Sequence, residues 1–293
     1  MKTIGFLYMN TTKTIVVTGG AGFVGSHVVQ RLVEGGHRVI VVDNYFMGAG
    51  VKIEGAEYRE GHTKNIDALV PEKPDLIFHL GEYSRTEESL LEPYVVWDLN
   101  IAGSLGVFEF WRKHGCKLIY AGSSTKFADG GAGKAQSPYA WSKSLNSETV
   151  RRYHEWYGLP FATTYFYNVF GPGERAGKYG TLIEIFRQKM LQGEPLTVRK
   201  PGSQKRIFTH VEDIVDGLLC VAEKGENDEY GLGAETKYSV LDIAHFFGGE
   251  IEWLPERGGN RADASIDLTT SHALGWKARR DVVDYIAAIK NKP

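Results

Sequence analysis

Cysteine is scarce in this sequence: two are present among 293 residues, Cys116 and Cys220. Both stand in apolar surroundings, and they do not form the Cys-x-x-Cys spacing typical of zinc sites and dithiol redox sites. Disulfides persist mainly in oxidising compartments. We therefore expect two reduced core cysteines, no metal site and a cytoplasmic location.

Long apolar runs and surplus charge are also missing. No stretch approaches the roughly 18–20 apolar residues that a membrane-spanning helix needs, so we expect no membrane partner. We interpret residues 1–13 as a short tail before the first strand rather than a signal peptide. The formal net charge of −2 lacks the basic surplus typical of nucleic-acid binders, so we expect no nucleic-acid partner.

What the chain does contain is a regular alternation of two patterns. Apolar runs that end in glycine or polar turns indicate buried strands, and stretches with apolar residues at helical spacing separate them. The runs are "TIVVTG", "RVIVVDN", "PDLIFHLG", "KLIYAGSS" and "PFATTYFYNVFG". This alternation predicts an α/β fold of the Rossmann type, a doubly wound parallel sheet with helices on both faces.

A glycine-rich stretch, "VVTGGAGFVGSH", joins the first strand to the first helix, with Gly19, Gly22 and Gly25 at three-residue spacing. The helix start offers free N–H groups to a pyrophosphate, and glycines allow the backbone to approach it. Asp43 ends the second strand, where a carboxylate accepts hydrogen bonds from the ribose hydroxyls of adenosine. Asp43 would repel a 2′-phosphate, and Asn44 rather than arginine follows it. The predicted cofactor is therefore NAD rather than NADP.

The pattern changes after residue 168, which suggests a division of the chain into two domains. We expect residues 1–168 to form an NAD-binding Rossmann domain, to which residues 207–235 return. Residues 169–206 and 236–293 carry shorter, mixed elements. We expect them to form a smaller mixed α/β C-terminal substrate-binding cap.

A serine, a tyrosine and a lysine are the candidate catalytic residues. Ser123 follows a predicted strand, at the carboxyl edge where doubly wound sheets place their sites. In "SPYAWSK", Tyr139 and Lys143 stand one helical turn apart. The lysine charge favours the phenolate, which acts as a general base, and Ser123 would bind the oxygen that loses the proton. Singly these are ordinary surface residues, but together with the glycine loop they predict hydride transfer.

At this point the sequence resembles the extended short-chain dehydrogenase/reductase family, specifically its NAD-dependent nucleotide-sugar epimerases and dehydratases of the UDP-glucose 4-epimerase type. The resemblance runs over nearly the whole chain. The matching segments are "TGGAGFVGSH", "VVDN", "FHLGEYSRTEES", "DLNIAGS", "SPYAWSK", "YFYNVFGPGE", "GSQKRIFTHVEDIVDG" and "PERGGNR".

The resemblance implies a set of site residues. Cofactor contacts are expected from Gly19, Gly22, Phe23, Val24, Gly25, Asp43, Asn44, Leu80, Gly81, Asn100, Tyr139 and Lys143. Substrate contacts are expected from Ser84, Ser123, Ser124, Asn168, Arg206 and Arg257, with Arg261 as a further candidate. Of these, Arg206 and Arg257 would clamp the diphosphate of a nucleotide sugar by bidentate hydrogen bonds.

The sequence departs from the family pattern in several places. Dehydratases carry an Asp-Glu pair after the catalytic hydroxyl, and decarboxylases a glutamate near this place, but here Ser124 and Thr125 follow. The stretch 124–138 is also short. Glu82 and Arg85 stand where the family has small apolar residues, and either they contact the substrate or they pair with each other.

The function expected from the resemblance is an NAD-dependent nucleoside-diphosphate-sugar epimerase, acting at C4 through a transient 4-keto sugar. A 4,6-dehydratase or a 4-keto reductase of the same family is the alternative, and a non-catalytic NAD-binding sensor is a third reading from another class. The resemblance also implies a homodimer, joined through the helices that follow Asn100 and begin at Tyr139. The nucleotide base and the sugar remain open.

Overall fold

The computed structural model describes residues 11–124, 133–256 and 267–290, so most of the expected N-terminal tail lies outside the described residues. Its largest element is a seven-stranded sheet in the order β11-β6-β5-β4-β1-β2-β3. All its neighbouring strands are parallel. The strands are β1 (Thr14–Thr18), β2 (Arg38–Asp43), β3 (Glu57–Glu60), β4 (Leu76–His79), β5 (Lys117–Ser123), β6 (Phe161–Phe166) and β11 (Asn227–Leu232). The predicted doubly wound α/β fold is confirmed.

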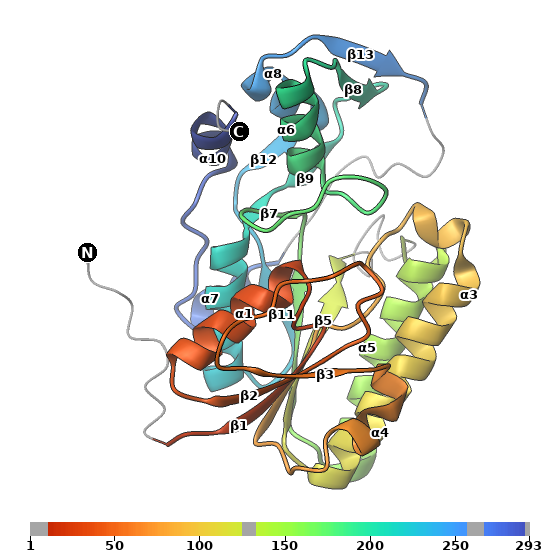
Figure 1. The fold of residues 1–293 in the computed structure, drawn as a ribbon, viewed down its shortest axis with the longest axis vertical. Helices are drawn as coiled ribbons and strands as arrows, with labels where there is room; N and C mark the ends of the chain where they lie inside the picture. The colour runs from red at the N-terminus through yellow and green to blue at the C-terminus, as the bar shows by residue number, and fades with distance from the viewer. Residues whose placement is uncertain (1–10, 125–132, 257–266, 291–293) are drawn as a thin grey trace.

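Helices cover both faces of the sheet, because successive residues of a strand point to opposite faces. Ile15 and Val17 of β1 lie in one buried cluster, together with residues of α1 (Phe23–Glu34) and α7 (Val211–Lys224). Val16 lies in a second cluster, with α4 (Gly103–His114) and α5 (Pro138–Tyr157). Figure 1 shows the two helix pairs on opposite sides of the sheet. Each fully buried aliphatic side chain stabilises this sandwich by about 1.5–3 kcal/mol.

A smaller unit sits above the carboxyl edge of the sheet (Figure 1). Its helices are α6 (Leu182–Gln192), α8 (Val240–Phe247) and α10 (Val282–Ile289). Its strand pairs are β8 (Leu196–Arg199) with β13 (Ile251–Leu254) and β9 (Lys205–Ile207) with β12 (Lys237–Ser239). A further pair, β7 (Val169–Phe170) with β10 (Thr209–His210), forms where the chain passes between the sheet and this unit. A separate core, which includes Phe186, Phe247 and Ile286, holds it together.

Short helical elements complete the described chain. They are the 3₁₀ turns Thr63–Asn65 and Glu88–Leu90, the π-helical turn Trp97–Ala102, and the helices α2 (Ile66–Leu69), α3 (Pro93–Val96) and α9 (Thr269–Ala273). The segment after β4 runs through several of these turns and crosses the top of the sheet. Its first residues, which precede the turn Glu88–Leu90, include Glu82, Ser84 and Arg85, and these three line the space under the cap.

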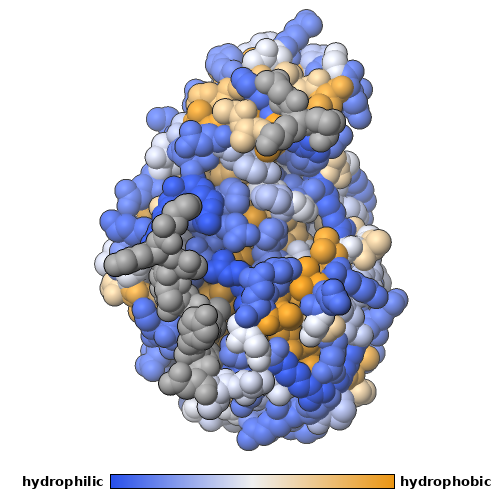
Figure 2. All heavy atoms as spheres, turned by 60° about the vertical axis from the view of Figure 1, so that its left-hand side comes forward, coloured by the Kyte–Doolittle hydropathy of each residue, from blue (hydrophilic) through white to orange (hydrophobic). Residues whose placement is uncertain are grey.

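The structure also describes features outside the cavity: the cysteines, the metal-ligating side chains, the helix lengths and the surface. Cys116 and Cys220 are buried and unbridged, and burial raises the pKa of Cys116 to about 12. The described residues contain no group of three or more metal-ligating side chains. None of the described helices combines the length and the apolar character needed to cross a membrane. The face in Figure 2 is mostly hydrophilic, with hydrophobic residues gathered in separate patches.

Candidate active site

A cavity of about 720 Å³ lies at the carboxyl edge of the sheet, under the cap. Strand ends of β1, β2, β4, β5 and β6 reach it, as expected for a doubly wound sheet. Most of the predicted site residues line it: Gly19, Gly22, Phe23, Val24, Gly25, Asp43, Asn44, Leu80, Gly81, Ser84, Ser123, Ser124, Tyr139, Lys143, Asn168 and Arg206. Asn100 does not. Arg257 and Arg261 lie outside the described residues.

The glycine loop forms the floor of one end of the cavity. Gly19 has a φ of +71°, and a Cβ added to it would lie 2.6 Å from the Cα of Gly81. A Cβ on Gly25 would lie 2.1 Å from the carbonyl oxygen of Gly19. Both positions therefore require glycine. Because these two residues have no side chain, β1, α1 and the end of β4 approach one another closely. The backbone between them forms a shallow cradle.

The cradle fits the pyrophosphate and ribose of a dinucleotide. Helix α1 begins at Phe23 without a side-chain cap, so its first N–H groups face the cradle with a partial positive charge. Asp43 accepts hydrogen bonds from Ala21 N (3.0 Å) and Tyr45 N (2.9 Å), which fixes its carboxylate beside the loop. A carboxylate has further lone pairs for ribose hydroxyls. These residues fit NAD.

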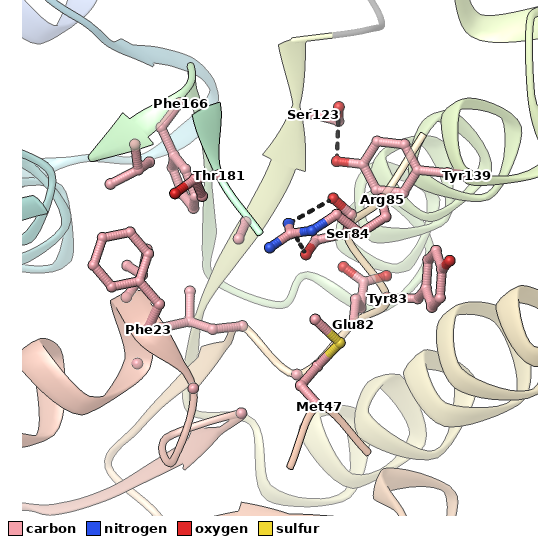
Figure 3. A pocket seen from close by; sticks show the side chains of 18 of the residues that line it. Phe23, Met47, Glu82, Tyr83, Ser84, Arg85, Ser123, Tyr139, Phe166 and Thr181 are labelled. Carbon is pink, nitrogen blue, oxygen red and sulfur yellow. Dashed lines mark hydrogen bonds between the residues drawn. The ribbon is translucent and has the colours of Figure 1, made fainter. Parts of the chain in front are cut away.

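Ser123 and Tyr139 meet at the other end of the cavity (Figure 3). The Tyr139 hydroxyl donates to Ser123 Oγ at 3.1 Å. Helix α5 begins here because Ser137 caps it, accepting from Ala140 N at 3.1 Å, and because Pro138 occupies its first turn. The Ser137 N-cap fixes where α5 begins. Tyr139 and Lys143 then lie one turn apart on the face of α5 that lines the cavity.

The ammonium of Lys143 lies beneath the cavity, in a buried polar cluster. It donates to the carboxylate of Glu82 and to the carbonyl of Ala121. The Lys143 and Glu82 side chains are only 6% and 3% exposed. Glu82 Oε1 also accepts from Asn146 (2.7 Å) and Ser104 (2.9 Å). Every oxygen of this buried carboxylate is therefore bonded.

The cluster holds Glu82 ionised. Burial opposes the charge, but the Lys143 ammonium and the surrounding donors outweigh it and lower the pKa of Glu82. His79 bonds Ser104 Oγ at 2.9 Å and Thr18 Oγ1 at 2.7 Å. Burial lowers the pKa of His79 to about 4, so this ring is neutral at physiological pH. The sole full charges in the described cluster are thus those of Glu82 and Lys143.

Asn100 supports the loop after β4 from below. Its side chain is fully buried and both accepts from Tyr83 N (2.6 Å) and donates to Tyr83 O (3.1 Å). It also donates to Ser142 Oγ at 2.9 Å. The family resemblance predicts a direct cofactor contact for Asn100, but Asn100 does not line the cavity. The structure instead uses these donors and acceptors to fix the segment that carries Glu82 and Ser84.

Glu82 and Arg85 do not pair with each other. Glu82 is committed to Lys143, while Arg85 donates to Tyr179 O and to Ser84. On the cap side, Asn168 Nδ2 donates to Ile207 O at 2.9 Å, and Arg206 lines the cavity nearby. The loop 174–181 also lines the cavity, although none of its residues belongs to the predicted site. Its signal was the glycine-rich continuation of the "NVFGPGE" segment.

Comparison with known proteins agrees with this geometry. The sequence matches the NAD dependent epimerase/dehydratase family over residues 15–233, and the chain belongs to this family. The predicted family and the NAD cofactor are therefore confirmed. A relative, UDP-glucuronic acid decarboxylase 1 of Xenopus tropicalis, is 28% identical over 94% of this chain and 70% of its own length.

Two solved structures extend the likeness to the whole fold. UDP-glucose 4-epimerase of Thermotoga maritima, solved with UDP-glucose, has a TM-score of 0.87 and 27% identity, covering 94% of this chain and 97% of that chain. The Bordetella bronchiseptica enzyme WbmF, solved with NAD⁺ and UDP, has a TM-score of 0.81 and 26% identity, covering 96% and 92%. The relatives include both epimerases and decarboxylases.

Proposed function

We propose that the chain is a nucleoside-diphosphate-sugar 4-epimerase that uses a retained NAD. The observation that carries the proposal is the Tyr139–Ser123 hydrogen bond of 3.1 Å, in one cavity with the glycine cradle and with Lys143. A phenol and a hydroxyl side by side can bind one substrate oxygen between them. That arrangement suits removal and return of a proton at a single carbon.

NAD held in the glycine cradle would supply reversible hydride transfer at the carbon that Tyr139 serves. Tyr139 takes the proton from the 4-hydroxyl and later returns it to the 4-keto oxygen. Ser123 holds that oxygen in line with Tyr139. Lys143 is fixed by Glu82 and by the carbonyl of Ala121, one turn of α5 after Tyr139, and its charge would favour the phenolate of Tyr139.

The cap holds the diphosphate in this proposal. Asn168 and Arg206 line the cavity on the cap side, and an arginine offers bidentate hydrogen bonds to a phosphate. A sugar held mainly by its diphosphate can rotate when its hydroxyls are released. That rotation presents the other face of the 4-keto sugar to the hydride. Arg257, outside the described residues, is proposed as a second phosphate ligand.

The composition of the catalytic pocket favours epimerisation over the alternatives. Ser124 follows Ser123 and lines the cavity, where a dehydratase would need an acid to expel water. A 4-keto reductase would consume reduced cofactor, whereas epimerisation regenerates NAD. The sensor reading is disfavoured because Ser123, Tyr139 and Lys143 are all present and converge on one cavity.

Product analysis tests the proposal directly. The purified protein is incubated with UDP-sugars and TDP-sugars without added cofactor, and the products are followed by NMR at the C4 proton. We expect interconversion of the C4 epimers with no net change in cofactor. A stable keto sugar, a pentose product with release of CO₂, or a strict need for reduced cofactor would contradict the proposal.

We further propose a division of the chain and a homodimer. Strand β11 pairs with β6 and the cap has its own core, which supports residues 1–168 with 207–235 as one unit and 169–206 with 236–293 as the other. Helices α4 and α5 bury Val107, Phe108, Phe110, Trp111 and Tyr153, but leave Leu105, Trp141, Leu145 and Trp156 exposed. Those exposed side chains form the proposed two-fold contact.

A further inference from the structure

Arg85 brings a positive charge into the cavity from the segment after β4. Its Nε and Nη2 donate to Tyr179 O at 2.8 and 2.5 Å, and its Nη1 donates to Ser84 O at 3.2 Å and Ser84 Oγ at 3.1 Å. All of these acceptors are neutral. Two of the three groups are backbone carbonyls, so the guanidinium is held in place at both ends without being neutralised.

No carboxylate of the described residues forms an ion pair with Arg85; Glu88 acts on its charge only from a longer distance, and the cation Arg175 acts in the opposite direction. Glu82 is bound to Lys143, and Glu92 to Lys178 at 2.9 Å and to the Tyr179 hydroxyl at 2.8 Å. Burial lowers the pKa of Arg85, although an arginine remains charged at any physiological pH. A shielded cation with neutral neighbours is a binding point for an anion.

The position of Arg85 decides which part of a ligand it meets. Figure 3 shows its guanidinium pointing into the cavity beside Ser84, on the side of Tyr139 and Ser123. The proposed diphosphate contacts, Asn168 and Arg206, come from the cap side instead. Arg85 therefore faces the sugar near the carbon where the proton is removed.

We propose that Arg85 binds a carboxylate on the sugar, carried next to the carbon that reacts with Tyr139, so that the substrate is a nucleoside-diphosphate uronic acid rather than a neutral hexose. This inference rests on the proposed function of the same site. In a hexopyranose the C6 group is attached to C5, the neighbour of C4. A C6 carboxylate thus lies within reach of a guanidinium beside Tyr139. The bonds to Tyr179 O and to Ser84 use four of the five N–H groups of Arg85, so one Nη2 N–H is left to donate a charge-assisted hydrogen bond to that carboxylate.

UDP-glucuronic acid and UDP-glucose are the probes, because they differ only in whether C6 is a carboxylate or a hydroxymethyl group. Binding of each, and of UDP alone, is measured by calorimetry on the purified protein with its retained cofactor. The wild type is expected to bind the uronic acid at least about tenfold more tightly than UDP-glucose, as a charge-assisted pair allows.

Arg85→Met is expected to abolish that preference while the affinities for UDP-glucose and UDP stay within about twofold. Arg85→Lys, which keeps the charge, is expected to retain part of the preference. Arg38→Met is the control, because Arg38 pairs with Glu57 and Glu72 at the amino end of β2, far from the cavity. Thermal unfolding of each variant reports on folding.

Three other results of the binding experiment would contradict the proposal, each in a different way. An equal loss of affinity for all three ligands in Arg85→Met would place Arg85 on the diphosphate and overturn the carboxylate assignment. An unchanged preference would also overturn it, since Arg85 would then serve only the loop 174–181. If none of the three ligands binds the wild type, the proposed function itself fails for uridine nucleotides, a result distinct from binding without C6 discrimination.

Discussion

Lys143 and Glu82 form a buried ion pair at the base of the cavity. Lys143 lies one turn after Tyr139 in helix α5. Lys143 is the charge expected to favour the phenolate of Tyr139. Here that charge is matched by a carboxylate that itself accepts from Asn146 and Ser104. The pair fixes the position of the ammonium and also reduces its net field at the phenol.

Removing the carboxylate charge should therefore shift the working pH. In Glu82→Gln, the Lys143 ammonium acts on the phenol without compensation, so the pH–rate profile is expected to move to lower pH. The measurement is single-turnover reduction of the retained cofactor by substrate between pH 5 and 10. Glu57→Gln, an exposed change on β3, is the control. A profile that keeps its wild-type position would show that Glu82 only anchors Lys143.

The second prediction concerns the proton-transfer pair. Tyr139→Phe should lose at least about a hundredfold in turnover, since general acid–base catalysis supplies about 10²–10⁴. Its thermal stability and its retained NAD should stay near wild type, because among the described residues the hydroxyl forms a hydrogen bond to Ser123 alone. Tyr157→Phe at the exposed end of α5 is the matched control. Near-normal turnover of Tyr139→Phe would rule out the assignment.

The glycine cradle gives a third prediction. Gly25→Ala places a Cβ 2.1 Å from Gly19 O, so the loop must open and the protein should purify without NAD. Gly36→Ala is the control, because Gly36 has a positive φ of +78°, unlike Gly25, and no atom lies within 4 Å of the added Cβ. It should cost about 1 kcal/mol in the free energy of unfolding while NAD stays bound. Cofactor content is read from the absorbance of the denatured protein. Equal NAD content in both variants would contradict the fit of NAD to this loop.

The proposed homodimer predicts the effect of single charges. Leu145→Glu should convert the dimer to monomers, because it buries a charge in an apolar contact centred on the exposed side of α5. Sedimentation velocity measures the change. Leu191→Glu on α6 is the control, since Leu191 is 43% exposed and Leu145 44%, but Leu191 lies on the cap. A wild-type monomer, or a dimer that survives Leu145→Glu, would exclude this contact.

The raised pKa of Glu174 predicts that the free energy of unfolding depends on pH. Burial raises its pKa to about 7, although Gly171 N and Thr181 donate to it. The folded state binds this proton more tightly than the unfolded state does, so the stabilisation is complete below the unfolded pKa and is lost as the pH rises toward 7. Relative to Glu174→Gln, the wild type should lose about 1–3 kcal/mol of unfolding free energy between pH 4 and pH 8. Urea denaturation at both values measures it. A constant difference between the two proteins would contradict the raised pKa.

The sheet was largely predictable from the sequence because its central strands are buried on both faces. β1, β2 and β4 read as continuous apolar runs, which only a two-sided burial explains. β3 reads Glu-Tyr-Arg-Glu and was not predicted. It lies at the sheet edge, where Arg59 pairs with Glu72 at 2.6 Å, so its pairing depends on tertiary contacts rather than on a local pattern.

The site was predictable where chemistry follows spacing, and not where it depends on a distant partner. Gly19, Gly25 and Asp43 belong to one local motif, and Tyr139 and Lys143 to one helix face. The partner of Glu82 is 61 positions away in the chain, and nothing in "HLGEYSR" indicates it. The sequence likewise indicates Asn100 as a cofactor ligand. Only the folded chain shows that the Asn100 side chain bonds Tyr83 and Ser142 instead.

The pairing of β6 with β11 has a consequence for how the chain is made. Residues 167–226 lie between these two strands and include the first half of the cap. During synthesis β6 therefore remains an open sheet edge until residue 232 has left the ribosome, although the six strands β1 to β6 are already complete. An unpaired parallel edge is a template for strands of other chains. Truncation before β11 is thus a route to aggregation rather than to a smaller functional enzyme.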